Sequence, residues 1–465
     1  MKEKFDLRTL EGSKRIFRIS VAAVILFSFF AYMFACNWGR VKISELNIDS
    51  RGSVMQATMY TPTNTNSESN LPCVIFTHGL SCNHSTVNPF AEELAKRGFA
   101  VLSVSTYGSG ESETSDMSDP SFGMYDALQY VRTLNYVDQT RIGMIGHSQG
   151  SKNTSAAVDM DSSLYTLNDL KINILYDTFA QKFTAEEIKQ SADDLAAARL
   201  DANELSAYKV LAAQAEQYFT TRMKAAVILG GNWGSEAQEV TVGGITVTRE
   251  ANTNMCYMIS TFNEGRAGTG QQNLSKEEMM AKFQSAEPLT AATWYSLDQT
   301  SNVQNPASTK LGGLEDVSYT TDTALASAID NRTTRIIVNQ LGGHAKDYFS
   351  KDSMHYIAKY FEQTLQYNCG NITDPATVPM SEHSSTFMIR ETLDLLAMFA
   401  CSSALLLWQV CCCTEEIRRT AYGMLRTLHH QKEWDFLAGG CAFDRKHHDR
   451  GIFCCNKGSH AGIQE

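Results

Sequence analysis

The sequence predicts an α/β fold, in which a mostly parallel central sheet carries helices on both faces and two transmembrane helices flank the domain. Three observations support this prediction: strand patterns alternate with helix patterns, a serine in a Gly-x-Ser-x-Gly segment follows one strand, and two long apolar segments lie outside the alternating region. Alternation of this kind is typical of a parallel sheet, because each return between parallel strands needs a crossover helix. With 465 residues, the chain has room for one large domain and appendages.

The alternating region begins with residues 41–60, where two stretches of alternating polarity favour an antiparallel hairpin. After it, short apolar runs indicate buried strands, and segments with apolar residues at helical spacing indicate helices. The expected strands are residues 73–79, 99–105, 141–145, 223–231, 255–261 and 335–341, and the expected helices are residues 87–98, 123–135, 152–158 and 351–365.

Two insertions interrupt the alternation. Residues 165–221 are rich in Ala and Glu and predict a helical insertion, and residues 239–249 predict a hairpin that turns at Gly243 and Gly244. A helical insertion of this size fits either a lid over a site or a block packed outward against the sheet.

Ser148 is the candidate nucleophile, because it stands between Gly146 and Gly150 where a strand gives way to a helix. A serine on such a tight turn adopts strained backbone geometry that exposes its hydroxyl, and residues two positions away must be small. The helix that follows directs its positive end at the same place. The pentapeptide alone is a weak signal, and the strand and helix around it strengthen the assignment.

Four glycine-containing segments lie at the ends of expected strands: FTHGLSCN at 76–83, STYGSGES at 105–112, YVDQTRIGMIGHSQGS at 136–151 and LGGHAKDYFS at 341–350. Together they resemble the α/β-hydrolase family, and more narrowly its dienelactone-hydrolase and prolyl-peptidase-like branches. The resemblance runs from about Val41 to Leu365. It implies an α/β-hydrolase fold and a serine hydrolase with a catalytic triad and an oxyanion hole.

The resemblance implies that His344 is the general base, since it follows the last expected strand in a glycine-rich loop. A serine hydroxyl needs such an imidazole to take its proton. By the same analogy, the backbone N–H groups of Leu80 and Gln149 form the oxyanion hole. The histidines we expect to be packed, solvated or part of local loop structure are His78, His84, His147, His355 and His383.

The acid of the triad is harder to assign. The family places it after the strand that ends near residue 261, and relatives carry aspartate where Asn263 stands. The adjacent Glu264 is the carboxylate of this turn and is the candidate acid, although it also fits a solvated turn residue. The alternatives in the preceding long insertion remain open: Asp316, Asp322 and Asp330.

The first apolar segment, residues 19–36, lies between Arg18 and Arg40 and is long enough to cross a bilayer. A cleaved signal peptide is the competing interpretation, and we favour an uncleaved anchor because the apolar stretch is long for a signal core. The second segment, residues 392–413, lacks a polar face at helical spacing, which favours a span over a buried core helix.

Basic residues precede the first span and follow the second, so both chain ends are expected in the cytoplasm and the domain between the spans on the outer face. The expected parts are a cytoplasmic N-terminus at 1–18, the anchor at 19–36, the hydrolase domain at 41–368, a linker at 369–391, the second span at 392–413, and a partly disordered cytoplasmic tail at 414–465.

Composition narrows the partners. The net charge of −11 argues against nucleic acid. Most of the twelve cysteines lie outside the outer segment and do not indicate a disulfide framework. The tail carries His and Cys but lacks the spacing of a zinc site, so we expect no metal and no cofactor.

These observations predict a membrane-anchored serine hydrolase that cleaves an ester or related acyl bond through a Ser148 acyl-enzyme, with His344 as base. Two alternatives remain: a serine exopeptidase of the same fold, and an α/β-hydrolase-fold binding module without catalysis. The expected partners are a small acyl or peptide substrate and the lipid bilayer. The sequence leaves the oligomeric state open.

Overall fold

The computed structural model describes residues 9–114, 118–231, 237–262, 276–283, 288–289, 291, 294–297, 323–365, 386–409 and 411–412. Residues 25–397 form one compact unit, which contains the central sheet, and residues 1–24 and 398–465 are grouped in a second unit.

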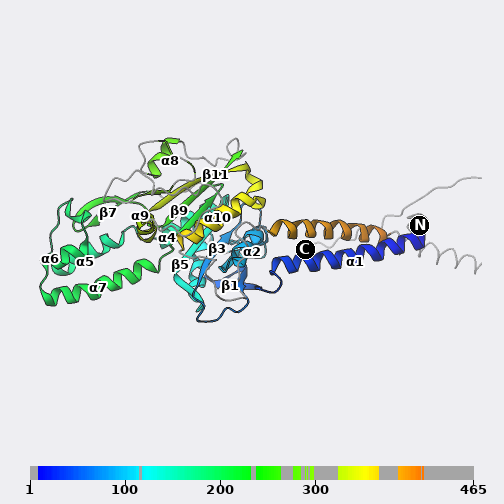
Figure 1. The fold of residues 1–465 in the computed structure, drawn as a ribbon, viewed down its shortest axis with the longest axis horizontal. Helices are drawn as coiled ribbons and strands as arrows, with labels where there is room; N and C mark the ends of the chain where they lie inside the picture. The colour runs from blue at the N-terminus through cyan, green and yellow to red at the C-terminus, as the bar shows by residue number, and fades with distance from the viewer. Residues whose placement is uncertain are drawn as a thin grey trace, which may run out of the picture. The chain divides into compact units, whose positions relative to one another are not determined.

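A central sheet of nine described strands organises the larger unit (Figure 1). Neighbouring strands lie in the order β1-β2-β4-β3-β5-β6-β9-β11-β10. All pairings from β4 to β11 are parallel, whereas β1, β2 and β10 pair antiparallel at the two sides. The strands are β1 (Val41–Ser50), β2 (Ser53–Pro62), β3 (Leu71–Thr77), β4 (Ala100–Val104), β5 (Val137–His147), β6 (Ala225–Leu229), β9 (Asn254–Phe262), β10 (Trp294–Ser296) and β11 (Thr334–Gly343).

Helices cover both faces of this sheet, as the sequence predicts. Side chains alternate along each strand, so Val74 and Phe76 of β3 join one core cluster and Cys73 and Ile75 join another. The first cluster includes residues of α2 (Asn88–Lys96), α9 (Thr323–Asp330) and α10 (Lys351–Thr364), and the second those of α3 (Met124–Arg132) and α4 (Gln149–Asp161). Both clusters are almost fully shielded from water, which stabilises the sheet.

The predicted α/β architecture with a mostly parallel sheet is therefore confirmed. The expected strands and helices occur within a few residues of their predicted bounds, including the hairpin β7 (Gln238–Val242) and β8 (Ile245–Arg249) with its turn at Gly243 and Gly244. The sequence analysis missed β10, because three residues are too short to show a periodic pattern. The short helices are η2 (His84–Val87), η3 (Glu187–Lys189), η5 (His344–Phe349) and α8 (Lys276–Lys282).

The helical insertion has a small core of its own. It consists of α5 (Leu167–Phe179), α6 (Ala192–Arg199) and α7 (Ala202–Thr220), which pack with the β7–β8 hairpin around Ile172, Leu175, Tyr208 and Val242. The chain enters it from the end of α4 and leaves it just before β6, where the Met223 N–H donates to the Asp161 carboxylate at 2.6 Å.

Both attachments of the insertion lie at the amino ends of the parallel strands. Helix α4 begins directly after Ser148 and has 13 residues, so it carries the chain about 20 Å away before the insertion starts. We therefore favour the outward-packing interpretation of residues 165–221 over the lid.

Among the described residues, two helices are long and apolar enough to cross a membrane: α1 (Leu10–Ala35), with a mean hydropathy of 2.0 over an 18-residue window, and Phe387–Gln409, with 1.4. In each, the most apolar window is only 11% buried. Core helices and signal sequences can also be this apolar, so the two helices weakly suggest membrane association. Both helices begin before the spans predicted from the sequence. The expected tail falls within residues 413–465, which lie outside the described residues.

The start of the helix Phe387–Gln409 is hydrogen-bonded to α2. The carboxylate of Glu93 accepts hydrogen bonds from the Phe387 N–H at 3.0 Å and the Thr386 hydroxyl at 3.1 Å. Lys96 and Arg97 each lie 3.1 Å from the same carboxylate. Burial alone would raise the pKa of Glu93, but these two cations outweigh it and hold the pKa below its ordinary value.

The pKa of the neighbouring Glu92 is shifted in the opposite direction. Its side chain is 2% exposed and lies 3.3 Å from the Arg390 guanidinium. Burial outweighs this attraction and raises the pKa of Glu92 to about 7. In the folded state Glu92 thus keeps its proton between about pH 4.5 and 7, where the unfolded chain has lost it. This group makes the protein less stable as the pH rises through that window.

We expect Glu92→Gln to remove this pH dependence, since glutamine has no proton to lose. The free energy of unfolding in detergent should rise by roughly 1–3 kcal/mol near pH 8 and change little near pH 5. Urea denaturation at both pH values, with the exposed Glu68→Gln as control, measures the effect. An unchanged slope of stability against pH in Glu92→Gln would contradict the prediction.

Candidate active site

The candidate nucleophile lies on the expected strand–turn–helix. Strand β5 ends at His147, α4 begins at Gln149, and Ser148 between them has φ 55° and ψ −115°. This is a strained conformation for a residue with a side chain. The Ser148 N–H donates to the Leu229 carbonyl of β6 at 2.9 Å, which fixes the turn to the sheet.

The glycines on either side of Ser148 are required by backbone contacts. A Cβ at Gly146 would lie 2.0 Å from the Gly150 carbonyl oxygen, and one at Gly150 would lie 2.4 Å from the His78 carbonyl oxygen. Backbone atoms have no rotamer to escape such clashes. The small-residue pattern of the motif therefore has a direct steric cause in this chain.

The candidate base lies at the same edge of the sheet. Strands β5 and β11 both run in the parallel direction, and η5 starts with His344 where β11 ends. The imidazole of His344 stacks on that of His147, with ring centroids 4.5 Å apart and an interplanar angle of 27°. The residue directly before Ser148 thus contacts the candidate base.

Asp347 joins this pair, and the sequence analysis missed it. One carboxylate oxygen, Oδ2, lies 3.3 Å from His147 Nε2 and 3.7 Å from His344 Nδ1, and the other accepts a hydrogen bond from Ser260. The side chain is 1% exposed. A helix with three residues per turn places Asp347 above His344, so the i, i+3 spacing after the histidine was the available signal.

Gly230 leaves space for the carboxylate and the imidazole. It has φ +63°, and a Cβ there would lie 2.7 Å from Asp347 Oδ2 and 2.9 Å from His344 Nδ1. A side chain at this position would be strained and would displace one of the two groups.

The loop after β3 carries the expected oxyanion-hole residue Leu80. A Cβ placed on the preceding Gly79 would lie 3.0 Å from the Tyr348 hydroxyl oxygen, 3.1 Å from His147 Nδ1 and 3.2 Å from Ser148 Cβ. The Gly79 N–H donates to the Tyr348 hydroxyl at 2.7 Å. The loop that carries Leu80 is therefore fixed against the serine, and Gln149 is the first residue of α4.

The other described histidines have local partners or lie on another element. His78 Nε2 accepts from the Thr106 N–H at 3.3 Å, and burial lowers its pKa. Burial also lowers the pKa of His84, whose Nδ1 lies 2.9 Å from the Ser105 hydroxyl. His355 belongs to α10, and His383 lies outside the described residues.

The carboxylates considered from the sequence are not seen beside His344. Glu264, Asp316 and Asp322 lie outside the described residues. Asp330 ends α9 and lies 3.3 Å from the ammonium of Lys224, the residue that precedes β6. It is therefore located at the amino ends of the strands, opposite Ser148.

His147, His344 and Asp347 also bring three potential metal-ligand atoms within 4.8 Å of one another. However, His147 Nε2 lies 3.2 Å from the His344 carbonyl oxygen. A carbonyl oxygen can only accept, so Nε2 carries a proton and lacks the lone pair that a metal would need. The geometry therefore makes His147 Nε2 a hydrogen-bond donor to the backbone of His344.

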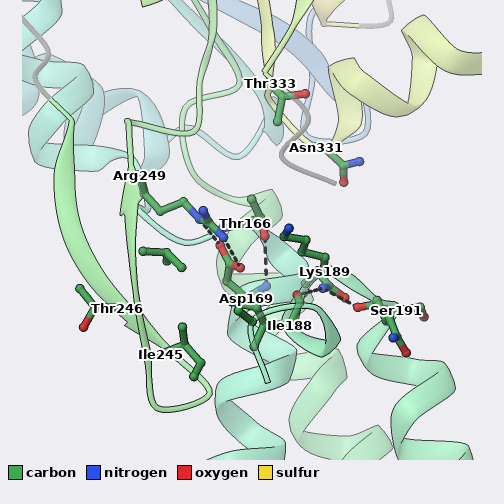
Figure 2. Close-up of a pocket in the computed structure, with 14 residues that line it drawn as sticks. Thr166, Asp169, Ile188, Lys189, Ser191, Ile245, Thr246, Arg249, Asn331 and Thr333 are labelled. Carbon is green, nitrogen blue, oxygen red and sulfur yellow. Dashed lines mark hydrogen bonds and ion pairs between the residues drawn. The ribbon is translucent and has the colours of Figure 1, made fainter. Parts of the chain in front are cut away.

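A cavity of about 390 Å³ lies in another part of the molecule, between the insertion, the β7–β8 hairpin and the segment before β11 (Figure 2). Arg249 makes a bidentate contact with Asp169 there, at 2.9 and 3.0 Å, so their charges offset each other. No histidine or cysteine is among its described lining residues.

Comparisons with known proteins give partial matches. No protein-family model matches the chain. The uncharacterised protein YcjY of Escherichia coli K12 is 26% identical over 140 residues, which are 29% of this chain and 46% of YcjY. The match thus spans about half the length of this curated relative.

Several solved structures are also similar. A bacterial heroin esterase is 25% identical over 26% of this chain and 39% of its own, with a TM-score of 0.23. Est1E of Butyrivibrio proteoclasticus, solved with ferulic acid, is 14% identical over 68% and 96%, with a TM-score of 0.31. A Pyrobaculum calidifontis esterase is 13% identical over 74% and 92%, with a TM-score of 0.32. Because these scores are low, the functional proposal depends on the geometry of the chain itself.

We expect Gly146→Ala to destabilise the protein by more than the roughly 1–3 kcal/mol that is typical of overpacking, because the new Cβ meets backbone. Gly342→Ala is the matched control: its Cβ would meet the side chain of Lys346, at 3.0 Å from Cδ, and no backbone atom is among its nearest contacts. Thermal denaturation of both variants measures the difference. Equal melting temperatures would show that the turn tolerates a side chain.

Proposed function

We propose that the protein is a membrane-anchored serine hydrolase that cleaves ester or related acyl bonds through a Ser148 acyl-enzyme, with His344 as general base. The observation that carries this proposal is the convergence at one sheet edge. There a strained serine at φ 55° follows His147, whose ring stacks on the imidazole of His344. Exposed, strained nucleophiles beside an imidazole are a feature of acyl-transfer sites.

In the proposed reaction, Ser148 Oγ attacks the carbonyl carbon of the substrate while His344 accepts the hydroxyl proton. The carbonyl electrons move to the oxygen, and when the tetrahedral intermediate collapses, His344 gives its proton to the leaving alkoxide. Water then attacks the acyl-enzyme, with His344 taking a proton from the water and returning it to Ser148. The products are an alcohol and an acid.

The backbone N–H groups of Leu80 and Gln149 are proposed to bind the negative oxygen of the intermediate. Two features support this role. The Leu80 loop is fixed beside Ser148 by the bond between the Gly79 N–H and the Tyr348 hydroxyl. Gln149 begins α4, whose amino end carries partial positive charge.

The anchoring part of the proposal rests on α1 and the helix Phe387–Gln409. Their length and hydropathy suit a bilayer, and basic residues before the first and after the second favour cytoplasmic chain ends. The hydrogen bonds from Phe387 and Thr386 to Glu93 join the second helix to the sheet domain. This arrangement would hold the site on the outer face of the membrane.

We expect a fluorophosphonate probe to label the full chain in detergent at Ser148. Ser148→Ala and His344→Ala should lower the labelling rate by about 10,000-fold or more, because the nucleophile or its activating base is lost. Ser85→Ala, which alters an exposed serine of η2, is the control. Labelling that persists in Ser148→Ala would exclude the proposed nucleophile. A folded wild type that is not labelled would favour a binding module.

We also expect the exposed loop 63–70 to be cleaved by protease added outside sealed cells, and an N-terminal tag to be protected. The positive charges near the spans determine this orientation. Immunoblotting of the fragments measures it, with detergent-opened cells as control. Cleavage of the tag alongside a protected loop would reverse the proposed topology.

A further inference from the structure

We infer that Asp347, and not Glu264, is the carboxylate that orients His344, and that His147 and Ser260 hold this carboxylate in place. The inference rests on the proposed function of Ser148 and His344, and it assigns a positioning residue to the same site.

The side of the imidazole that faces Asp347 supports the assignment. In a serine–histidine–acid site, the acid binds Nδ1 of the histidine and leaves Nε2 for the serine. Here Asp347 Oδ2 lies 3.7 Å from Nδ1 of His344. Catalytic hydrogen bonds are often long in the free enzyme and shorten when substrate binds, so this separation is compatible with the role.

Asp347 is a buried side chain that separate parts of the chain contact. A buried carboxylate is unfavourable unless hydrogen-bond donors surround it. The side chain of Asp347 is 1% exposed. It accepts a hydrogen bond from the Ser260 hydroxyl of β9 and faces the His147 ring of β5. Three elements, β5, β9 and η5, therefore meet at one carboxylate.

His147 contacts both the acid and the base. Its Nε2 lies 3.2 Å from the backbone oxygen of His344 and 3.3 Å from Asp347 Oδ2. Because a carbonyl oxygen can only accept, Nε2–H donates to His344, and this bond keeps the ring beside the carboxylate. One ring thus positions the acid and, at the same time, the backbone of the base.

The position of Asp347 also explains why the turn after β9 need not supply the acid. The resemblance places the acid immediately after this strand, where the sequence has Asn263 and Glu264. Ser260, near the end of β9, donates to Asp347. Asp347 thus reaches this strand end from η5, three residues after the histidine that it faces.

The test compares three carboxylate variants of the full chain in detergent, using the fluorophosphonate probe at increasing concentrations. Asp347→Asn keeps the shape but turns an acceptor-only group into one that also donates, which favours the wrong tautomer of His344. We expect its maximal labelling rate to fall about 1,000- to 10,000-fold, with half-saturation changed less than about threefold. Glu264→Gln and Asp330→Asn should label within about twofold of wild type.

A spectroscopic readout separates positioning from a merely structural role. In protein labelled with ¹⁵N-histidine, His344→Gln identifies the His344 signals. We expect wild type to show the proton on Nδ1, and Asp347→Asn to shift His344 towards the Nε2–H tautomer. Asp330→Asn should leave these signals unchanged.

The outcomes are distinguishable. Wild-type labelling at Ser148 with a normal rate in Asp347→Asn and a slow rate in Glu264→Gln would overturn the inference while the proposed function stands. If Asp347→Asn fails to fold, the labelling of Glu264→Gln still decides. Full labelling of Glu264→Gln supports Asp347 as the acid, and loss of labelling excludes Asp347. If wild type is not labelled, the proposed function fails, and an unchanged His344 signal in Asp347→Asn overturns the positioning role as well.

Discussion

The close backbone approach around Ser148 is the constraint on which the rest of the site depends. A Cβ on Gly146 would clash with the Gly150 carbonyl, and a Cβ on Gly150 would clash with the His78 carbonyl. The Ser148 N–H donates to the Leu229 carbonyl of β6. These contacts hold a non-glycine residue at positive φ, a conformation that the local chain would otherwise leave. The parallel register of β5, β6, β9 and β11 then brings the neighbouring strand ends to the same edge.

A second level of organisation is electrostatic. Asp347 is shielded from water, accepts a hydrogen bond from Ser260 of β9 and lies beside His147 of β5, so this side chain links segments far apart in the sequence. Glu93 has a comparable role on α2, where Lys96, Arg97 and the start of the helix Phe387–Gln409 converge on one buried side chain. In both places a buried charge is compatible with folding only because several partners are brought to it.

Much of the fold could be predicted from the sequence because its signals are local. Apolar runs such as 73–79 and helical spacing such as 123–135 depend on residues within one element. Ser148 and His344 could be nominated because glycine patterns mark the strand ends. Asp347 was missed, because its i, i+3 spacing to His344 is a weak signal and its burial against β5 and β9 depends on segments far from LGGHAKDYFS in the sequence. The role of Glu264 remains a prediction, because the residue lies outside the described part of the chain.

The contacts of His147 have a consequence for how the motif is interpreted. Written as Gly-x-Ser-x-Gly, the segment leaves its second position unspecified, as if any residue would serve. In this chain that position stacks a flat ring on His344, donates an N–H to the His344 carbonyl oxygen 3.2 Å away and lies 3.3 Å from the Asp347 carboxylate. A library that varies residue 147 would therefore sample the alignment of the proton-transfer groups, although the pattern itself stays intact in every member.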